Sequence, residues 1–374
     1  MFDGYTVRKV ERIFDRVRDG DYKSAITELE TSNLHKFFPD ALIDGFCCGL
    51  RSGDWKCLRE LFLDRAFISK DGMLLWMAPY RQLRNGVRHS AITGVLGVAP
   101  ISAGYSAIKE VARSRFGADF HGGAEIIGFR RVACFGLAGG RDGEAFLVPN
   151  NWEIGGVADG PAINDMSEQY ARLRRAEGMV RRFVFGSSAD LILAPVLDPI
   201  HGASTQNLEF QYHEVAHGVG IGFPQKLKIG LFRSFHNCAV EEWRSDGISF
   251  SLMAELLSDD QRGRMVAANL ALRLSVDALR IGGFEADHDA HATALTLQDL
   301  IDSGAATIDG GQLHLSAQSY AELPDAVDAQ RTQAWQTTRM EIKDGADCGA
   351  LSDIYARIKL RPETASKLAA LSMH

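Results

Sequence analysis

Two histidines and a glutamate in one short segment could bind a metal ion and activate water. His213 and His217 lie four positions apart, with Glu214 directly after the first histidine, in the pattern HExxH. On a helix, residues four apart lie on one face, so both imidazoles can point at one ion. Glu214 would lie roughly a third of a turn away. There it can hold a metal-bound water without being a ligand, as a general base does.

A second segment supplies the other groups that such a site needs. Glu242 opens the pattern ExxxD, and Asp246 follows it by one helical turn. We predict that Glu242 is the third ligand, and that Asp246 and Glu241 support the ligands from behind. Two histidines, one carboxylate and an open fourth position are typical of catalytic zinc. The sequence therefore predicts one Zn²⁺ per chain.

The surroundings of both segments are apolar. The alternative for HExxH alone is a polar helix whose histidines are solvated. Buried histidines beside a buried glutamate need a partner, however, and a metal ion supplies one. The charged turn around Glu242 is either a solvated helix N-terminus or a ligand set. Cys238 could approach the metal, although free cysteine is more often a small buried core residue. The apolar neighbours of the first motif are Leu208, Phe210, Val215, Val219 and Ile221.

A third region offers a donor for the oxyanion that forms on a substrate carbonyl. His288 and His291 begin an amphipathic pattern, and they are the best candidates by position. The alternative is a surface or capping role, which is common for histidine. Arg233 and Arg244 could bind a substrate carboxylate, with a solvated or ion-paired role as the alternative.

Composition restricts the classes of partner. The net charge of −7 argues against a nucleic-acid or anionic-membrane surface. No apolar run approaches the length of a membrane span, and the N-terminus does not have the order of a secretory signal. The six cysteines have no regular spacing, which favours free thiols in a cytoplasmic protein. Nothing in the sequence sets the oligomeric state.

The hydrophobic patterns predict an α+β fold that is mostly α-helical, with a helical zinc-binding lobe and a smaller β-containing region. We expect an N-terminal helical region over 1–116, a mixed α/β region with a β-hairpin over 117–205, and a helical zinc-binding catalytic region over 206–374. We expect a hairpin formed by 132–137 and 145–148, a strand over 191–197, and a turn or small hairpin over 308–315. The helices expected in the last region are 239–257, 259–281 and 286–303.

Three ordered segments resemble the dipeptidyl-peptidase III family of zinc peptidases. They are the Gly-Val-Gly that follows His217, the doubled glutamate that ends in Asp246, and the Ala-His pair at His291 with its leucine-rich run. The resemblance covers roughly 208–304. It implies that His213, His217 and Glu242 bind zinc, that Glu214 is the base, and that His291 stabilises the transition state. The chain departs from the family in having HExxH instead of HExxxH, and in having Asp246 instead of a glutamate.

Three functions follow as expectations. The first is a zinc hydrolase that cleaves a peptide or amide bond in a small peptide or a small-molecule amide. The second is a specialised metabolic zinc enzyme, such as an amidase, a lyase or a rearrangement catalyst, that acts on a small non-peptide substrate. The third is a non-catalytic helical binding protein with a residual zinc site.

Overall fold

The computed structural model describes residues 4–84, 87–101, 104–139, 145–157, 160–228, 230–231, 234–277, 284, 288–344 and 347–372. The backbone divides into two compact units. Unit 1 comprises Met1–Ser102 and Ala124–Gln169, and unit 2 comprises Ala103–Gly123 and Tyr170–His374.

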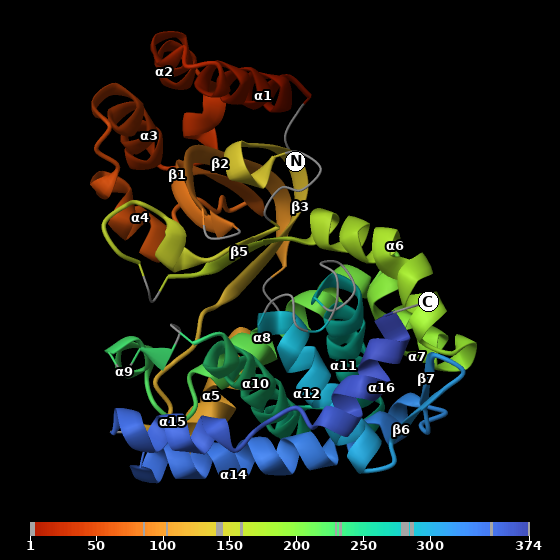
Figure 1. The fold of residues 1–374 in the computed structure, drawn as a ribbon. Coiled ribbons are helices and arrows are strands. Elements are labelled where there is room, and N and C mark those ends of the chain that lie inside the picture. Colours follow the sequence, from red (N-terminus) through yellow and green to blue (C-terminus); the bar gives the residue numbers. More distant parts are fainter. Residues whose placement is uncertain are drawn as a thin grey trace. The chain divides into compact units, whose positions relative to one another are not determined.

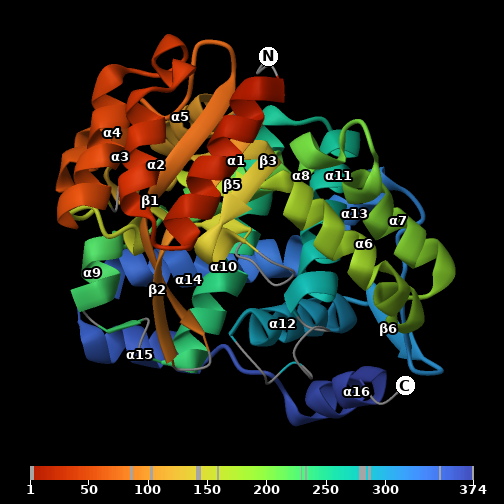
Figure 2. The same cartoon turned by 90° about the horizontal axis from the view of Figure 1, so that it is seen from above.

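Unit 1 combines short helices with a five-stranded sheet (Figure 1). Helix α1 packs against β2 and β3 of this sheet (Figure 2). The helices are α1 (Gly4–Arg18), α2 (Tyr22–Glu30), η1 (Asn33–Lys36), α3 (Asp40–Ser52), η2 (Lys56–Leu58), α4 (Arg59–Leu63), η4 (Gly136–Ala138) and η5 (Pro149–Asn151). The strands are β1 (Met73–Arg84), β2 (Val87–Ile101), β3 (Ile126–Phe135), β4 (Phe146–Leu147) and β5 (Ala162–Asp165).

The strand order is β1-β2-β3-β5-β4, and the β3–β5 pair is the parallel one. Two glycines of β2, Gly94 and Gly97, lie directly against aromatic rings of β3. A Cβ at Gly94 or at Gly97 would lie 2.1 Å from the ring of Phe135 or of Phe129, respectively. Glycine at both positions therefore lets the rings pack directly on the strand.

The structure corrects the expectation of a helical region over 1–116, because β1 and β2 lie inside it. Residues 73–78 of β1 are apolar without interruption and are all buried. A strand buried on both faces shows no alternation, so its pattern cannot be told from that of a buried helix.

Two other predictions about strands are wrong. Segments 132–137 and 145–148 do not form a hairpin, because β3 pairs with β2 and β5, while β4 pairs with β5. Segment 191–197 is the end of a helix, not a strand. It is a short apolar run, and such a run fits either element until its packing partners are known.

Unit 2 is a set of packed helices with one small hairpin, and α14 and α15 lie side by side in it (Figure 1). Segment 308–315 was expected to form a turn or a small hairpin, and the antiparallel pair β6 and β7 shows that it is a hairpin. The elements are α5 (Tyr105–Phe116), η3 (Gly117–Asp119), α6 (Met166–Phe183), which begins in unit 1, α7 (Gly186–Leu197), α8 (Gly202–His217), α9 (Phe223–Lys228), α10 (Phe235–Leu256), α11 (Asp259–Leu272), the π-helical turn η7 (Arg273–Asp277), α12 (His288–Asp302), β6 (Ala306–Asp309), β7 (Gln312–Leu315), η8 (Tyr320–Glu322), α13 (Leu323–Ala326), α14 (Asp328–Asp344), α15 (Cys348–Ala356) and α16 (Pro362–Ser372).

Helices α8 and α10 form the centre of unit 2. Helix α8 packs against α5, α7, α10 and α11, and α10 also packs against α12 and α14. The polar residues of α8 are therefore buried together with its apolar ones, among them Gln206, Asn207, Glu209 and Gln211. The expected α+β, mostly helical class is confirmed. Among the helices that the structure describes, none has both the length and the apolar character needed to cross a membrane.

Candidate metal centre

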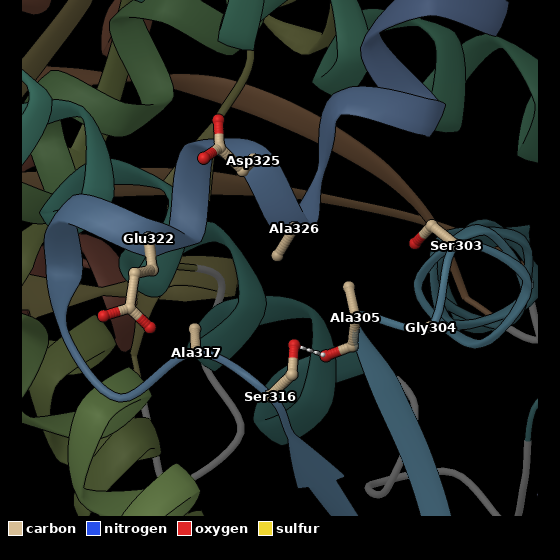
Figure 3. Close-up of a pocket in the computed structure, with 8 residues that line it drawn as sticks. All are labelled: Ser303, Gly304, Ala305, Ser316, Ala317, Glu322, Asp325 and Ala326. Atoms are coloured by element: carbon tan, nitrogen blue, oxygen red, sulfur yellow. Dashed lines mark hydrogen bonds between the residues drawn. The ribbon is translucent and has the colours of Figure 1, made fainter.

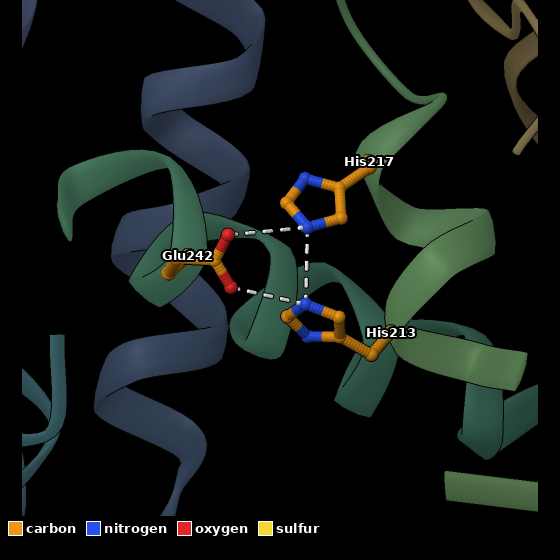
Figure 4. A group of neighbouring side chains, drawn as sticks. All are labelled: His213, His217 and Glu242. Atoms are coloured by element: carbon orange, nitrogen blue, oxygen red, sulfur yellow. Dashed lines mark hydrogen bonds and ion pairs between the residues drawn. The ribbon is translucent and has the colours of Figure 1, made fainter. Parts of the chain in front are cut away.

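His213 and His217 of α8 and Glu242 of α10 point their side chains at one another (Figure 4). The two Nε2 atoms are 3.0 Å apart. Glu242 places Oε2 3.2 Å from Nε2 of His213 and Oε1 3.6 Å from Nε2 of His217. The three residues predicted as ligands thus lie together in unit 2.

These separations suit a small tetrahedral cation. Zinc bonds of about 2.0 to 2.1 Å in a tetrahedron place the ligand atoms about 3.3 to 3.4 Å apart. The other ring nitrogens of both histidines face carboxylates, so Nδ1 of each carries the proton. Two imidazole nitrogens and a carboxylate then converge on one point, a set of donor atoms that could bind a cation.

Asp246 holds the back of His213, with Oδ1 2.8 Å from Nδ1. Arg273 donates from Nε to Oδ2 of Asp246 at 2.9 Å, and Asn269 donates from Nδ2 to Oδ1 at 3.0 Å. Burial disfavours ionisation of this carboxyl. The Arg273 charge and the hydrogen bond from His213 nevertheless hold the pKa of Asp246 below its usual value. Asp246 is therefore a charged acceptor that fixes the His213 ring.

Glu241 holds the back of His217 in the same way, with Oε1 3.0 Å from Nδ1, and Ser245 places its Oγ 2.9 Å from the same nitrogen. Two buried cations surround this carboxylate: Lys226 donates to Oε1 at 2.5 Å, and Arg244 donates from Nη2 to Oε1 at 2.7 Å. Burial raises the pKa of Glu241, but the charges of Arg244 and Lys226 outweigh it and hold that pKa well below its usual value. Each ligand histidine thus has its own ionised carboxylate.

The proton affinity of the ligand set is also perturbed. Burial disfavours a charged His213. Hydrogen bonds to Asp246 and Glu242 outweigh burial and raise the pKa of His213 well above its usual value. A metal ion that bound here would therefore compete with a proton on His213.

Glu214 is half-buried on α8 beside the ligands. Among the residues that the structure describes, its carboxylate has no hydrogen-bond or ion-pair partner in the protein, which leaves it available to a water or a substrate. Its backbone is tightly covered: a Cβ at Gly123 would lie 2.2 Å from the carbonyl oxygen of Glu214. A Cβ at Gly218 would lie 1.9 Å from the carbonyl oxygen of Gly122. The glycines on both sides allow the two backbones to meet.

The predicted oxyanion donors lie at the start of α12. His291 is half-buried, and its ring meets those of Phe235 and His236 edge-on at centroid distances of 5.8 Å. The side chain of His288 is 47% exposed and lies 3.7 Å from Asp289. His291 therefore neighbours the first turn of α10, the helix that provides Glu242.

Two other residues singled out in the sequence, Arg244 and Cys238, belong to the part of the chain that the structure describes. Arg244 is fully buried, with ion pairs to Glu241 and Glu341, so the structure does not place it where a substrate could reach it. Cys238 is half-buried. Burial, with the charges of Glu242 and Glu241, raises the pKa of its thiol to about 11. Arg233 lies outside the described residues.

Several residues that hold the site were missed in the sequence. Four buried residues bond to the carboxylates behind the two histidines. Lys226 and Tyr355 bond to Glu241, and Asn269 and Arg273 bond to Asp246. Arg273 gave the clearest signal, since it is a charge within the apolar run Ala-Leu-Arg-Leu. A buried charge in such a run needs a charged partner.

Unit 2 also has a hollow of about 280 Å³ between the end of α12, the β6–β7 hairpin and α13 (Figure 3). Among the described residues that line it, the polar side chains are two serines and two carboxylates, without a histidine or a cysteine. Glu322 accepts hydrogen bonds from Gln318 and Ser319, which belong to its own turn. The hollow shares no lining residue with the His-His-Glu cluster. That cluster is the one group of potential metal ligands found among the described residues.

The fold is similar to two solved structures. One is dipeptidyl-peptidase III from Corallococcus sp. strain EGB, with a TM-score of 0.59 and 14% identity over 95% of this chain and 67% of that chain. The other is DPP III from Caldithrix abyssi, with a TM-score of 0.66 and 12% identity over 96% of this chain and 68% of that chain. At this identity the likeness establishes the fold. No curated protein sequence matches the chain.

A sequence family matches the chain directly. The matched segment, residues 38–257, is more than half of the chain and includes both His213 and Glu242. The chain therefore belongs to the family described as a family of unknown function, DUF6014.

Proposed function

We propose that this protein is a zinc-dependent hydrolase that cleaves a peptide or amide bond. The observation that carries the proposal is the convergence of His213, His217 and Glu242, with both histidines supported from behind by ionised carboxylates. A similar fold in two dipeptidyl-peptidase III structures supports the same class of reaction.

Zinc bound by these three side chains would supply an acidified water and a Lewis acid for the substrate carbonyl. Glu214 accepts the proton of the attacking water and delivers it to the leaving nitrogen. Its lack of a protein partner in the described part of the chain suits this exchange. His291 donates to the oxyanion of the substrate.

The decisive experiment combines metal analysis with Glu214→Gln. We expect one zinc per chain in both proteins, with turnover lowered about 10²- to 10⁴-fold in the variant. Glu255→Gln is the matched control, because Glu255 is exposed near the other end of α10 and pairs with Arg115. Full turnover in Glu214→Gln would contradict the role of the base. Absence of zinc from the wild type would contradict the proposal as a whole.

The substrate class requires its own test, because a small non-peptide molecule is the alternative. A mixture of short peptides with free and blocked ends, incubated with the zinc-loaded protein, should yield defined fragments. The same mixture with Glu214→Gln is the control for contaminating peptidases. Stoichiometric zinc with no cleavage of any peptide would favour the small-molecule alternative.

A further inference from the structure

Arg273 lies behind the ligand cluster and belongs to no predicted motif. It begins the π-helical turn η7 after α11, and the residue is 6% exposed. Single π-helical turns are rare and occur frequently at functional sites. Here the turn places a guanidinium group within the buried carboxylates of α10.

The guanidinium group contacts three carboxylates from two helices. It donates to Asp246 at 2.9 Å from Nε and at 3.2 Å from Nη2. It reaches Oε2 of Glu242 at 3.3 Å from Nη2. It also donates from Nη1 to Asp289 at 3.2 Å. One residue thus joins a ligand, the partner of another ligand, and the first turn of α12.

This geometry needs arginine in particular. The guanidinium group has five N–H donors in a fixed plane, whereas a lysine ammonium is a compact charge on a flexible stem. The three nitrogens of the planar guanidinium group can face three carboxylates at once. Asn269 also donates to Asp246, but it is neutral and cannot offset the charge.

We propose that Arg273 is a positioning residue of the metal centre: it fixes Glu242 and Asp246 for metal binding and ties both to Asp289 on the helix that carries His291. The proposal rests on the metal centre of the proposed function and adds a residue that acts through the ligands. An ion pair that only stabilised the fold would affect unfolding but not the ligand geometry.

The test compares Arg273→Lys and Arg273→Met with the wild type in zinc affinity and in the visible spectrum of the cobalt-substituted protein. We expect both variants to bind zinc roughly 10- to 100-fold more weakly. We also expect a changed cobalt spectrum, because that spectrum reports ligand geometry. Arg273→Lys keeps the charge, so it decides the question if Arg273→Met does not fold. Circular dichroism of the metal-free proteins verifies folding.

Arg131→Met is the matched control. Arg131 forms a comparable ion pair in unit 1 with Asp165, whose side chain is 5% exposed, and this pair belongs to a different core. The control should lower stability without changing zinc affinity. If folded Arg273→Lys binds zinc as tightly as the wild type with the same cobalt spectrum, the role of Arg273 is overturned and the hydrolase proposal survives. If the wild type binds neither zinc nor cobalt, both are overturned.

Discussion

Nδ1 of His217 lies 3.0 Å from Oε1 of Glu241, the residue directly before the ligand Glu242. Consecutive residues of a helix diverge by about 100°, so they cannot both face one point. On α10 the divergence is useful: Glu242 faces the Nε2 atoms, while Glu241 passes behind His217 and meets Nδ1. The doubled glutamate therefore supplies one member of the His-His-Glu cluster and a hydrogen-bond partner for another member.

Glu241→Gln should weaken zinc binding roughly 10- to 100-fold, because His217 loses its charged acceptor. The variant also leaves Lys226 and Arg244 buried without their shared carboxylate. Breaking a buried pair in this way costs about 3–5 kcal/mol, so the free energy of unfolding should fall as well. Chelator competition measures the affinity and urea unfolding measures the stability. Unchanged affinity in a destabilised variant would show that Glu241 serves the fold alone.

Gly123→Ala should destabilise the protein by about 1–3 kcal/mol, because the new Cβ would lie 2.2 Å from the carbonyl oxygen of Glu214. Gly178→Ala is the matched control. Gly178 lies within α6, and a Cβ added there would meet nothing within 4 Å, so the same change should stabilise by about 0.5–1 kcal/mol. Thermal unfolding of both variants gives the comparison. Equal changes in stability for the two variants would mean that the close contact between Gly123 and the carbonyl oxygen of Glu214 does not require glycine.

Removal of the metal should lower the melting temperature, since a ligand that binds only the native state stabilises it. At a free zinc concentration of 100 times Kd the stabilisation is about 2.7 kcal/mol. Calorimetry with zinc and with chelator measures the difference. His213→Ala should abolish the zinc-dependent shift. His35→Ala should retain it, because His35 belongs to unit 1 and pairs with Asp40. A shift that persists in His213→Ala would place the zinc elsewhere.

Local spacing was sufficient to predict which side chains lie together at the His213, His217 and Glu242 cluster. The HExxH and ExxxD patterns specify relative positions on two helices, and α8 and α10 bring those faces together. The class of fold was predictable for a related reason, because amphipathic helices leave a periodic pattern. The overall similarity to dipeptidyl-peptidase III also extends well beyond the segments that suggested it.

Contacts between distant segments were not predictable in this way. Lys226 reaches Glu241 from α9 and Tyr355 reaches it from α15, and no spacing along the chain encodes either contact. Strand β1 escaped prediction because burial on both faces removes the alternation that marks a strand. Tertiary packing sets both kinds of feature.

The stability of the protein should depend on pH through Asp299, a carboxyl of α12 that accepts hydrogen bonds from Trp243 and Gln333. Burial raises its pKa from the usual 3.8 to about 6, although both donors oppose the shift. Between these values the native state retains a proton that the unfolded chain releases, so stability must fall as pH rises through this interval. The fall should reach about 3 kcal/mol.

Asp299→Asn has no carboxyl to titrate and should lack this component. We therefore expect the stability of the wild type relative to Asp299→Asn to decline as pH rises from about 4 to 7. Urea unfolding of both proteins measures the difference. A chelator is present because metal binding at His213 depends on pH, and bound metal would add its own pH dependence to the stability. A constant difference across the interval would mean that Asp299 ionises in the native state at its ordinary pKa.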